Sequence, residues 1–139
     1  MTIWLTTAVE KLLVASAENL APFETGGMLL GWRDESDRII TDIVGPGDRA
    51  LHGRYAFVPD HRWQKQQLGS AFARSAGDLD YLGDWHTHPG GYAEMSAIDR
   101  ATLRRIGRKV PGALTLIAAG DRDTGWLMKA WAHRRTSFL

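Results

Sequence analysis

The sequence predicts an α/β domain in which helices pack on a single mixed β-sheet. Segments with the alternating pattern of strands follow segments with the 3.6-residue period of helices along the chain. Hairpin-like strand pairs are interspersed among them, which favours one mixed sheet with flanking helices. The chain has 139 residues, 44% of them hydrophobic and 24% charged, which is ordinary for a globular protein. We therefore expect one domain over residues 1–139.

The first part of the chain predicts a helix and a hairpin. Apolar residues recur with helical period over residues 7–18, and Thr6 or Thr7 can cap the helix start. After a break at Ala21-Pro22, "ETGGMLLGWRD" contains a buried strand. "DRIITDIVG" follows as a second strand across the polar turn "DESD".

The middle part predicts a loop, a short strand and a helix. "PGDRALHGRY" is rich in glycine and charge and has no clear period, so it is expected to be a loop. "YAFVP" is expected to be a short strand. The helix over residues 61–77 can begin at an Asp60 cap and stop at Gly77.

The last part predicts three strands and a helix. "DYLGDWH" has a strand pattern and leads into a Pro-Gly-Gly loop. A helix over residues 96–107 follows, with Ser96 as its cap. "ALTLIAAG" and "GWLMKAWAH" are two further strands around the turn "DRDT".

Composition excludes several kinds of protein. The chain contains no cysteine, which removes disulfides, thiolate zinc sites and cysteine nucleophiles, so a zinc site would have to use histidine and carboxylate. No apolar run is long enough to span a bilayer, and Glu10 and Lys11 interrupt the apolar pattern near the N-terminus, unlike a signal peptide. We expect a cytoplasmic protein with no membrane partner.

Charge is distributed unevenly. Residues 1–99 carry a net charge of −6 and residues 100–139 a net charge of +7, with the basic segments "RATLRRIGRK" and "HRR" in the second part. A solvated helix face accounts for most such patterns, and a patch that docks an acidic partner is the alternative. No aromatic residues are interleaved with these basic residues, so a nucleic-acid partner is not expected.

The stretch "DWHTHPGGYAEMSAIDR" has the pattern of a metal site. His86 and His88 are two positions apart, so a strand sends both side chains to the same side. Ser96 and Asp99 lie one helical turn apart and can face back toward the loop. Two histidines and one carboxylate leave a fourth tetrahedral position for water, which is typical of catalytic zinc.

Several carboxylates could serve as the base that such a site needs. Spacing alone does not choose among Glu24, Glu94 and Asp84. Glu24 precedes a buried strand, and burial at the edge of an apolar core would raise its pKa. Asp84 lies on the same strand face as His86 and could instead orient that imidazole. The other histidines, at 52, 61 and 133, lack ligand spacing and are expected to be structural or solvated.

These residues together resemble the JAMM metalloproteases of the MPN domain family. The family pattern is a glutamate, then His-x-His, seven residues, Ser, two residues and Asp. Glu24 and "HTHPGGYAEMSAID" match it in register, and the predicted element order agrees over nearly the whole chain. Met95 stands where many members carry proline. The chain looks like the minimal prokaryotic branch, since it lacks the second insertion of larger relatives.

The resemblance implies a role for each residue. His86, His88 and Asp99 would ligate one Zn²⁺ per chain. Glu24 would act as the base on water, and Ser96 would hydrogen-bond the developing oxyanion. The implied sheet is of the cytidine-deaminase-like type, but deaminases of that type use cysteine ligands, so deamination is excluded here.

The resemblance also implies a substrate class. The protein would be a zinc isopeptidase or peptidase that cleaves after the C-terminal glycine of a ubiquitin-like protein. Related bacterial enzymes occur with ubiquitin-activating and ubiquitin-conjugating enzyme homologues, including antiphage defence systems. The alternatives are processing of a sulphur-carrier protein in cysteine or thiamine-type biosynthesis, and a non-catalytic MPN scaffold. A substrate tail is expected to pair with a strand edge near residues 47–55.

Overall fold

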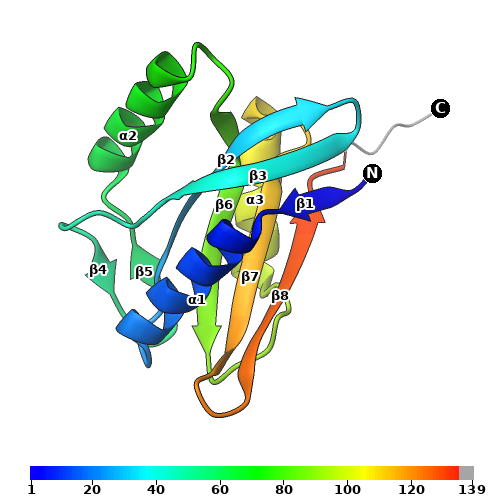
Figure 1. Cartoon of the computed structure of the whole chain (residues 1–139). Helices are drawn as coiled ribbons and strands as arrows, with labels where there is room; N and C mark the ends of the chain where they lie inside the picture. Colours follow the sequence, from blue (N-terminus) through cyan, green and yellow to red (C-terminus); the bar gives the residue numbers. More distant parts are fainter. Residues whose placement is uncertain (135–139) are drawn as a thin grey trace.

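A computed structural model of the protein describes residues 1–134, and its centre is a six-stranded mixed sheet (Figure 1). The strands are β1 (Ile3–Leu5), β2 (Gly26–Asp34), β3 (Asp37–Val44), β6 (Asp80–Pro89), β7 (Leu114–Asp121) and β8 (Gly125–Ala132). Their order across the sheet is β1-β3-β2-β6-β7-β8. β1 runs parallel to β3 and β6 parallel to β7, whereas the other neighbours are antiparallel. The predicted α/β class and mixed sheet are confirmed.

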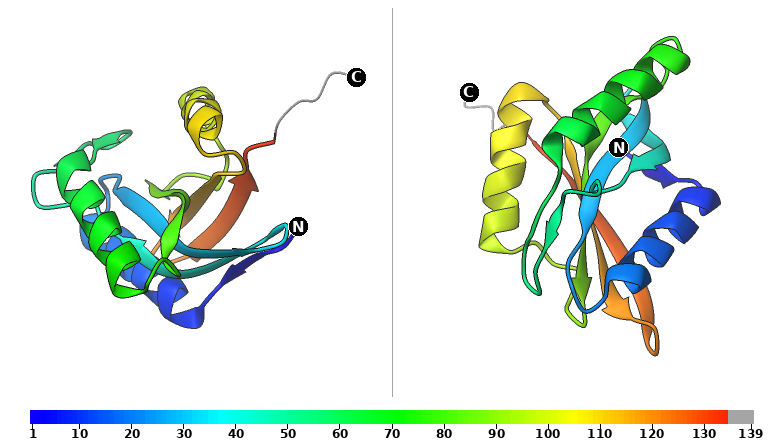
Figure 2. Two further views of the ribbon diagram at one scale, coloured as in Figure 1. Left: turned by 90° about the horizontal axis from the view of Figure 1, so that it is seen from above. Right: turned by 90° about the vertical axis from the view of Figure 1, so that its left-hand side faces the viewer.

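Helices cover both faces of this sheet (Figure 2). α1 (Thr7–Leu20) packs Val9 and Leu13 against the largest apolar cluster, which includes Leu29, Leu82 and Trp85. α2 (His61–Arg74) and α3 (Ala97–Lys109) lie on the opposite face. Within residues 1–134, no helix is both long and apolar enough to pass through a membrane.

The predicted caps and turns account for most element boundaries. Thr6 caps α1, and Asp60 caps α2 by accepting a hydrogen bond from the Trp63 N–H. The predicted first hairpin is β2-β3, and the predicted "DRDT" turn joins β7 to β8. α2 ends at Arg74, and Gly77, which was expected to end it, lies three residues later with φ of 88°.

Two short strands, β1 and β4 (Leu51–His52), were not predicted. β4 lies within the expected loop and pairs with β5 (Phe57–Val58) in a separate two-stranded sheet. The predicted "YAFVP" strand is therefore shorter and pairs with β4. Strands of two or three residues carry too few side chains to show a period, so only their partners define them.

Candidate metal centre

β6 presents the two histidines of the site on one face of the sheet. His86 and His88 point into a groove, and Thr87 between them is fully buried on the opposite face. The Thr87 hydroxyl accepts a hydrogen bond from the Thr25 N–H at 3.0 Å, and the Thr87 N–H donates to the Thr25 carbonyl at 2.9 Å. The strand alternation that the sequence predicts thus holds, and it ties the histidines to the segment that carries Glu24.

The first turn of α3 supplies the carboxylate. Ser96 caps the helix through its hydroxyl oxygen, which accepts a hydrogen bond from the Asp99 N–H at 3.1 Å. The Asp99 carboxylate accepts one in return from the Ser96 N–H at 2.9 Å, so the pair forms a capping box. The Asp99 side chain is therefore held in place by backbone hydrogen bonding and directed at the histidines.

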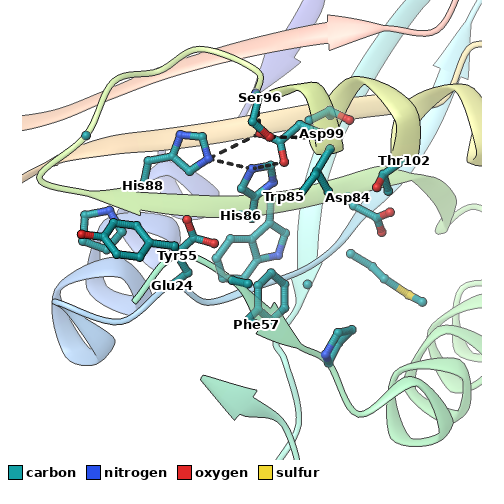
Figure 3. Close-up of a pocket in the computed structure, with 18 of the residues that line it drawn as sticks. Glu24, Tyr55, Phe57, Asp84, Trp85, His86, His88, Ser96, Asp99 and Thr102 are labelled. Atoms are coloured by element: carbon teal, nitrogen blue, oxygen red, sulfur yellow. Dashed lines mark hydrogen bonds and ion pairs between the residues drawn. The ribbon is translucent and has the colours of Figure 1, made fainter. Parts of the chain in front are cut away.

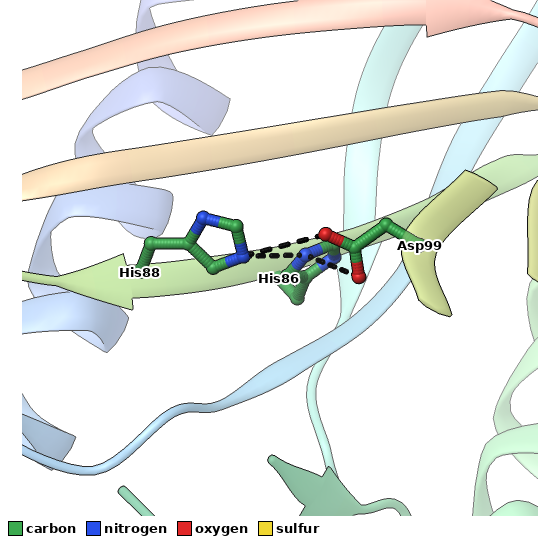
Figure 4. Close-up of side chains that lie close together, drawn as sticks. All are labelled: His86, His88 and Asp99. Atoms are coloured by element: carbon green, nitrogen blue, oxygen red, sulfur yellow. Dashed lines mark hydrogen bonds and ion pairs between the residues drawn. The ribbon is translucent and has the colours of Figure 1, made fainter. Parts of the chain in front are cut away.

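The three side chains converge at distances that suit one metal ion (Figure 4). The Nε2 atoms of His86 and His88 lie 3.1 Å apart, and they lie 3.3 and 3.5 Å from the two Asp99 oxygens. A tetrahedral zinc ion with bonds of about 2.0–2.1 Å has ligand–ligand edges of roughly 3.3–3.4 Å. The donor types and their separations therefore fit a zinc ion with a fourth position left open.

Hydrogen bonding and charge both act on these three candidate ligands. His88 Nδ1 lies 2.9 Å from the Tyr92 carbonyl, a contact in which Nδ1–H donates and Nε2 keeps its lone pair for a metal. Burial would raise the pKa of Asp99, but its contacts with His86 and His88 outweigh burial and hold that pKa well below its usual range. The same Asp99 contact raises the pKa of His88, against an opposing effect of burial.

Glu24 lies beside the three candidate metal ligands, on the other wall of the groove (Figure 3). Its side chain is turned toward the two histidines. Its backbone N–H donates to the Gly53 carbonyl at 2.8 Å, and its carbonyl lies 2.8 Å from His52 Nδ1. Burial raises the pKa of the Glu24 carboxyl, and the neighbouring imidazoles of His88 and His86 oppose that rise.

The structure discriminates among the carboxylates that spacing left open. Glu94 is 70% exposed at its side chain and lies 3.9 Å from Lys129, away from the histidines. Asp84 lines the same groove as His86, but within residues 1–134 it forms no hydrogen bond to that imidazole. Burial raises the pKa of Asp84 to about 6, and the nearby Tyr81 hydroxyl opposes that rise. Of these three carboxylates, only Glu24 is partly buried and also influenced by both His88 and His86.

The three histidines expected to be structural or solvated lie in three different environments. His52 stacks on Phe57 with ring centroids 6.3 Å apart and also holds the Glu24 backbone. His61 is exposed at the start of α2, and His133 packs against Gly107 of α3. The contact between His52 and Glu24 was not predicted, because it joins two segments without a shared period.

An open groove surrounds the site and runs between α2 and α3. Its walls near the ligands carry Tyr55 from the β4-β5 connection and Ile98 from α3, both more than three-quarters exposed. Sequence reasoning named no individual substrate-contacting residue. Tyr55 lies within the expected pairing edge of residues 47–55, whereas nothing in the sequence singled out Ile98.

Comparison with known proteins identifies the class to which this fold and site belong. The profile of a family described as prokaryotic homologs of the JAB domain matches residues 6–134. The chain belongs to this prokaryotic branch of the JAMM/MPN family, and it is a JAMM-type hydrolase.

Individual relatives agree with this assignment. The chain is 33% identical over 141 aligned residues to the probable metalloprotease y4qB of Sinorhizobium fredii, covering 96% of this chain and 85% of that protein. It is 37% identical over 106 residues to a CD-NTase/cGAS isopeptidase of Vibrio cholerae, covering 76% of this chain and 67% of that protein. A solution structure of a Desulfitobacterium hafniense protein superposes with a TM-score of 0.68 at 25% identity, covering 95% and 84% of the two chains.

Proposed function

We propose that this hydrolase is a zinc-dependent isopeptidase that cleaves after the C-terminal glycine of a ubiquitin-like protein. The observation that carries the proposal is the convergence of His86, His88 and Asp99 beside Glu24 in an open groove. The three ligands would hold the ion, and a bound zinc ion would supply Lewis-acid polarisation of the scissile carbonyl and a lowered pKa for water.

Glu24 has the properties of the proton carrier in this reaction. Its pKa is raised by burial, so a proton taken from the attacking water can be held and then passed on. The proton would go to the nitrogen of the departing lysine or α-amine as the C–N bond breaks. Two backbone hydrogen bonds, one donated by the Glu24 N–H to the Gly53 carbonyl and one accepted by the Glu24 carbonyl from His52, would hold the base in position.

Ser96 has a free proton to donate to the oxyanion of the tetrahedral intermediate. Its oxygen accepts from the Asp99 N–H, and this leaves the hydroxyl hydrogen available for a second partner. A single oxyanion donor of this kind typically raises kcat by a factor of about 10²–10³. Ser96 therefore combines the roles of helix cap and oxyanion donor.

The groove suits an extended glycine-containing tail. Gly27 lines the groove, and the Val44 carbonyl already occupies the space that a side chain at this position would need. The walls at Tyr55 and Ile98 are where the side chains of a tail would be contacted. The expected pairing edge near residues 47–55 remains part of the proposal.

The relatives named CD-NTase/cGAS isopeptidase support an isopeptide bond as the bond cleaved and a CD-NTase as the target protein. By analogy with them, the protein released from the ubiquitin-like modifier would be a CD-NTase, in a defence system that also contains ubiquitin-activating and ubiquitin-conjugating enzyme homologues. Processing of a sulphur-carrier protein would use the same residues on a linear bond.

The test uses ubiquitin-like proteins of the source organism with a reporter attached after the C-terminal glycine. One set carries the reporter on a lysine ε-amine and the other on an α-amine. We expect zinc-dependent release from the first set, and Glu24→Gln should reduce kcat by about 10²–10⁴ without loss of bound zinc. Release that survives Glu24→Gln would refute the assigned base, and a zinc-loaded protein that cleaves neither set would refute the activity.

A further inference from the structure

Helix α3 separates two hollows of different chemistry. One is the groove of the metal centre, which α3 lines with Thr102, Arg105 and Lys109. The other lies across the helix, where α3 meets the end of β8 (Figure 2). We call this second hollow the basic hollow, and its charged residues are Arg100, Arg104, Arg108 and Arg134.

Three of these arginines form a stripe along α3. Arg100, Arg104 and Arg108 are spaced by four residues, which places them one above another on the same helix face. Like charges at this spacing repel one another, and of the three only Arg108 lies in the last turn, where the helix dipole favours a positive charge. All three are exposed, and none forms an ion pair with a carboxylate within residues 1–134.

The hollow between the arginines has an apolar lining. Met95, Leu103, Pro111 and Ala132 contribute to it. His133 packs directly on Gly107, where any added Cβ would meet the imidazole at 2.1 Å, so the helix and the chain after β8 are fitted closely here. The Nδ1 atom of His133 is buried without a hydrogen-bond partner among the described residues. The hollow therefore offers apolar contact surrounded by positive charge.

We propose that the basic hollow docks an acidic segment of a partner protein, in which carboxylates flank an apolar side chain. The arginine stripe matches a run of carboxylates, since guanidinium groups bind carboxylates in bidentate geometry. The apolar lining matches the side chain between them. This binding does not depend on the proposed peptidase activity, because it uses a surface across α3 from the catalytic groove.

A nucleic acid fits this surface less well. The stripe spans nine residues of helix, or eight steps and about 12 Å from Arg100 to Arg108, which is enough for only a few phosphates. Among the described residues that line the hollow, none is a tyrosine, tryptophan or phenylalanine on which a base could stack. An apolar lining also has no partner in a phosphate backbone.

The test measures peptide binding to the isotope-labelled full chain by NMR. The probe is an acetylated peptide of glutamates around one leucine and one phenylalanine. Two matched peptides replace the glutamates by glutamine or the two apolar residues by serine, and a single-stranded DNA oligonucleotide is the fourth ligand. We expect the first peptide to shift backbone signals of residues 100–108 and 132–134, and both matched peptides to bind at least about tenfold more weakly.

Charge reversal at the stripe provides the decisive comparison. Arg104→Glu with Arg108→Glu should weaken binding by at least about tenfold, whereas Arg62→Glu with Arg74→Glu on α2 changes the net charge equally and should have little effect. If the glutamate pair on α3 unfolds the chain, Arg104→Gln with Arg108→Gln gives a smaller loss in the same direction. Equal loss in the α2 control, equal binding of the serine peptide, or tighter binding of the oligonucleotide would each overturn the proposal.

Discussion

His52 Nδ1 lies 2.8 Å from the backbone carbonyl of Glu24. The ring of His52 also stacks on Phe57, so it is fixed on one side by packing and on the other by a hydrogen bond. β4, which carries His52, belongs to a two-stranded sheet separate from the main one. The proposed base is therefore held by a small structure outside the sheet that carries the metal ligands.

We expect His52→Ala to lower kcat by about 10-fold or more with little change in bound zinc, because the Glu24 backbone loses its donor while the ligands stay in place. His52→Gln, whose amide can donate, should recover part of the activity. Leu51→Ala is a matched control, since Leu51 is 70% exposed in the same strand. Steady-state kinetics and zinc content measure these effects, and an unchanged kcat in His52→Ala would show that His52 does not position Glu24.

Ser96→Ala and Ser96→Gly separate the two proposed roles of Ser96. Both remove the hydroxyl, so both should lower kcat by about 10²–10³. Alanine at a helix N-cap costs about 1 kcal/mol of unfolding free energy, whereas glycine costs only a few tenths. Urea unfolding should therefore distinguish the two variants while their kinetics agree. A difference in kcat that follows the difference in stability would mean that Ser96 acts only as a cap.

The sequence could predict the parts of the site that depend on local geometry. Strand alternation placed His86 and His88 together, and the spacing of Ser96 and Asp99 is that of a capping box. The proximity of Glu24 could not be derived in this way. It depends on the β2-β6 pairing, in which Gly26 lies opposite His86 across sixty positions of chain. Only the family resemblance identified it.

Fold prediction missed two of the shortest strands for a related reason. β1 has three residues and β4 has two, and each is defined by the strand it pairs with. The contact between His52 and Glu24 was missed for the same reason, because β4 was expected to be a loop. Long-range register is not encoded in any local period, so features that depend on it need the three-dimensional structure.

Zinc binding should weaken as the pH falls, because protons compete for the histidine nitrogens. Neutral imidazole is the ligand, and Asp99 raises the pKa of His88 above its usual 6.5, so in the metal-free protein protonation of His88 begins at a higher pH than for an exposed histidine. Asp99 keeps its charge throughout, since its pKa is held well below the usual range. Binding is thus favoured above the raised pKa and lost below it.

Equilibrium dialysis with zinc between pH 8 and pH 5 measures this dependence. Asp99→Asn should weaken zinc binding at every pH and bring the protonation of His88 to a lower pH, because the carboxylate that raises its pKa is gone. A zinc affinity that is independent of pH over this range would contradict the assignment of histidine ligands.

A substitution at Gly27 would test how closely β2, the strand that follows Glu24, packs against β3. A Cβ at this position would lie 1.8 Å from the Val44 carbonyl oxygen of β3 and 2.9 Å from the Trp85 indole nitrogen. The Val44 oxygen is backbone and also accepts the hydrogen bond of that indole, so it cannot move without disturbing the β2-β3 pairing. We expect Gly27→Ala to lower the unfolding free energy by about 3 kcal/mol or to prevent folding.

Gly45→Ala is the control, because nothing lies within 4 Å of its added Cβ, and its effect should stay within about 1 kcal/mol. Equal stability of the two variants in urea unfolding would show that β2 and β3 pack less closely at Gly27 than described.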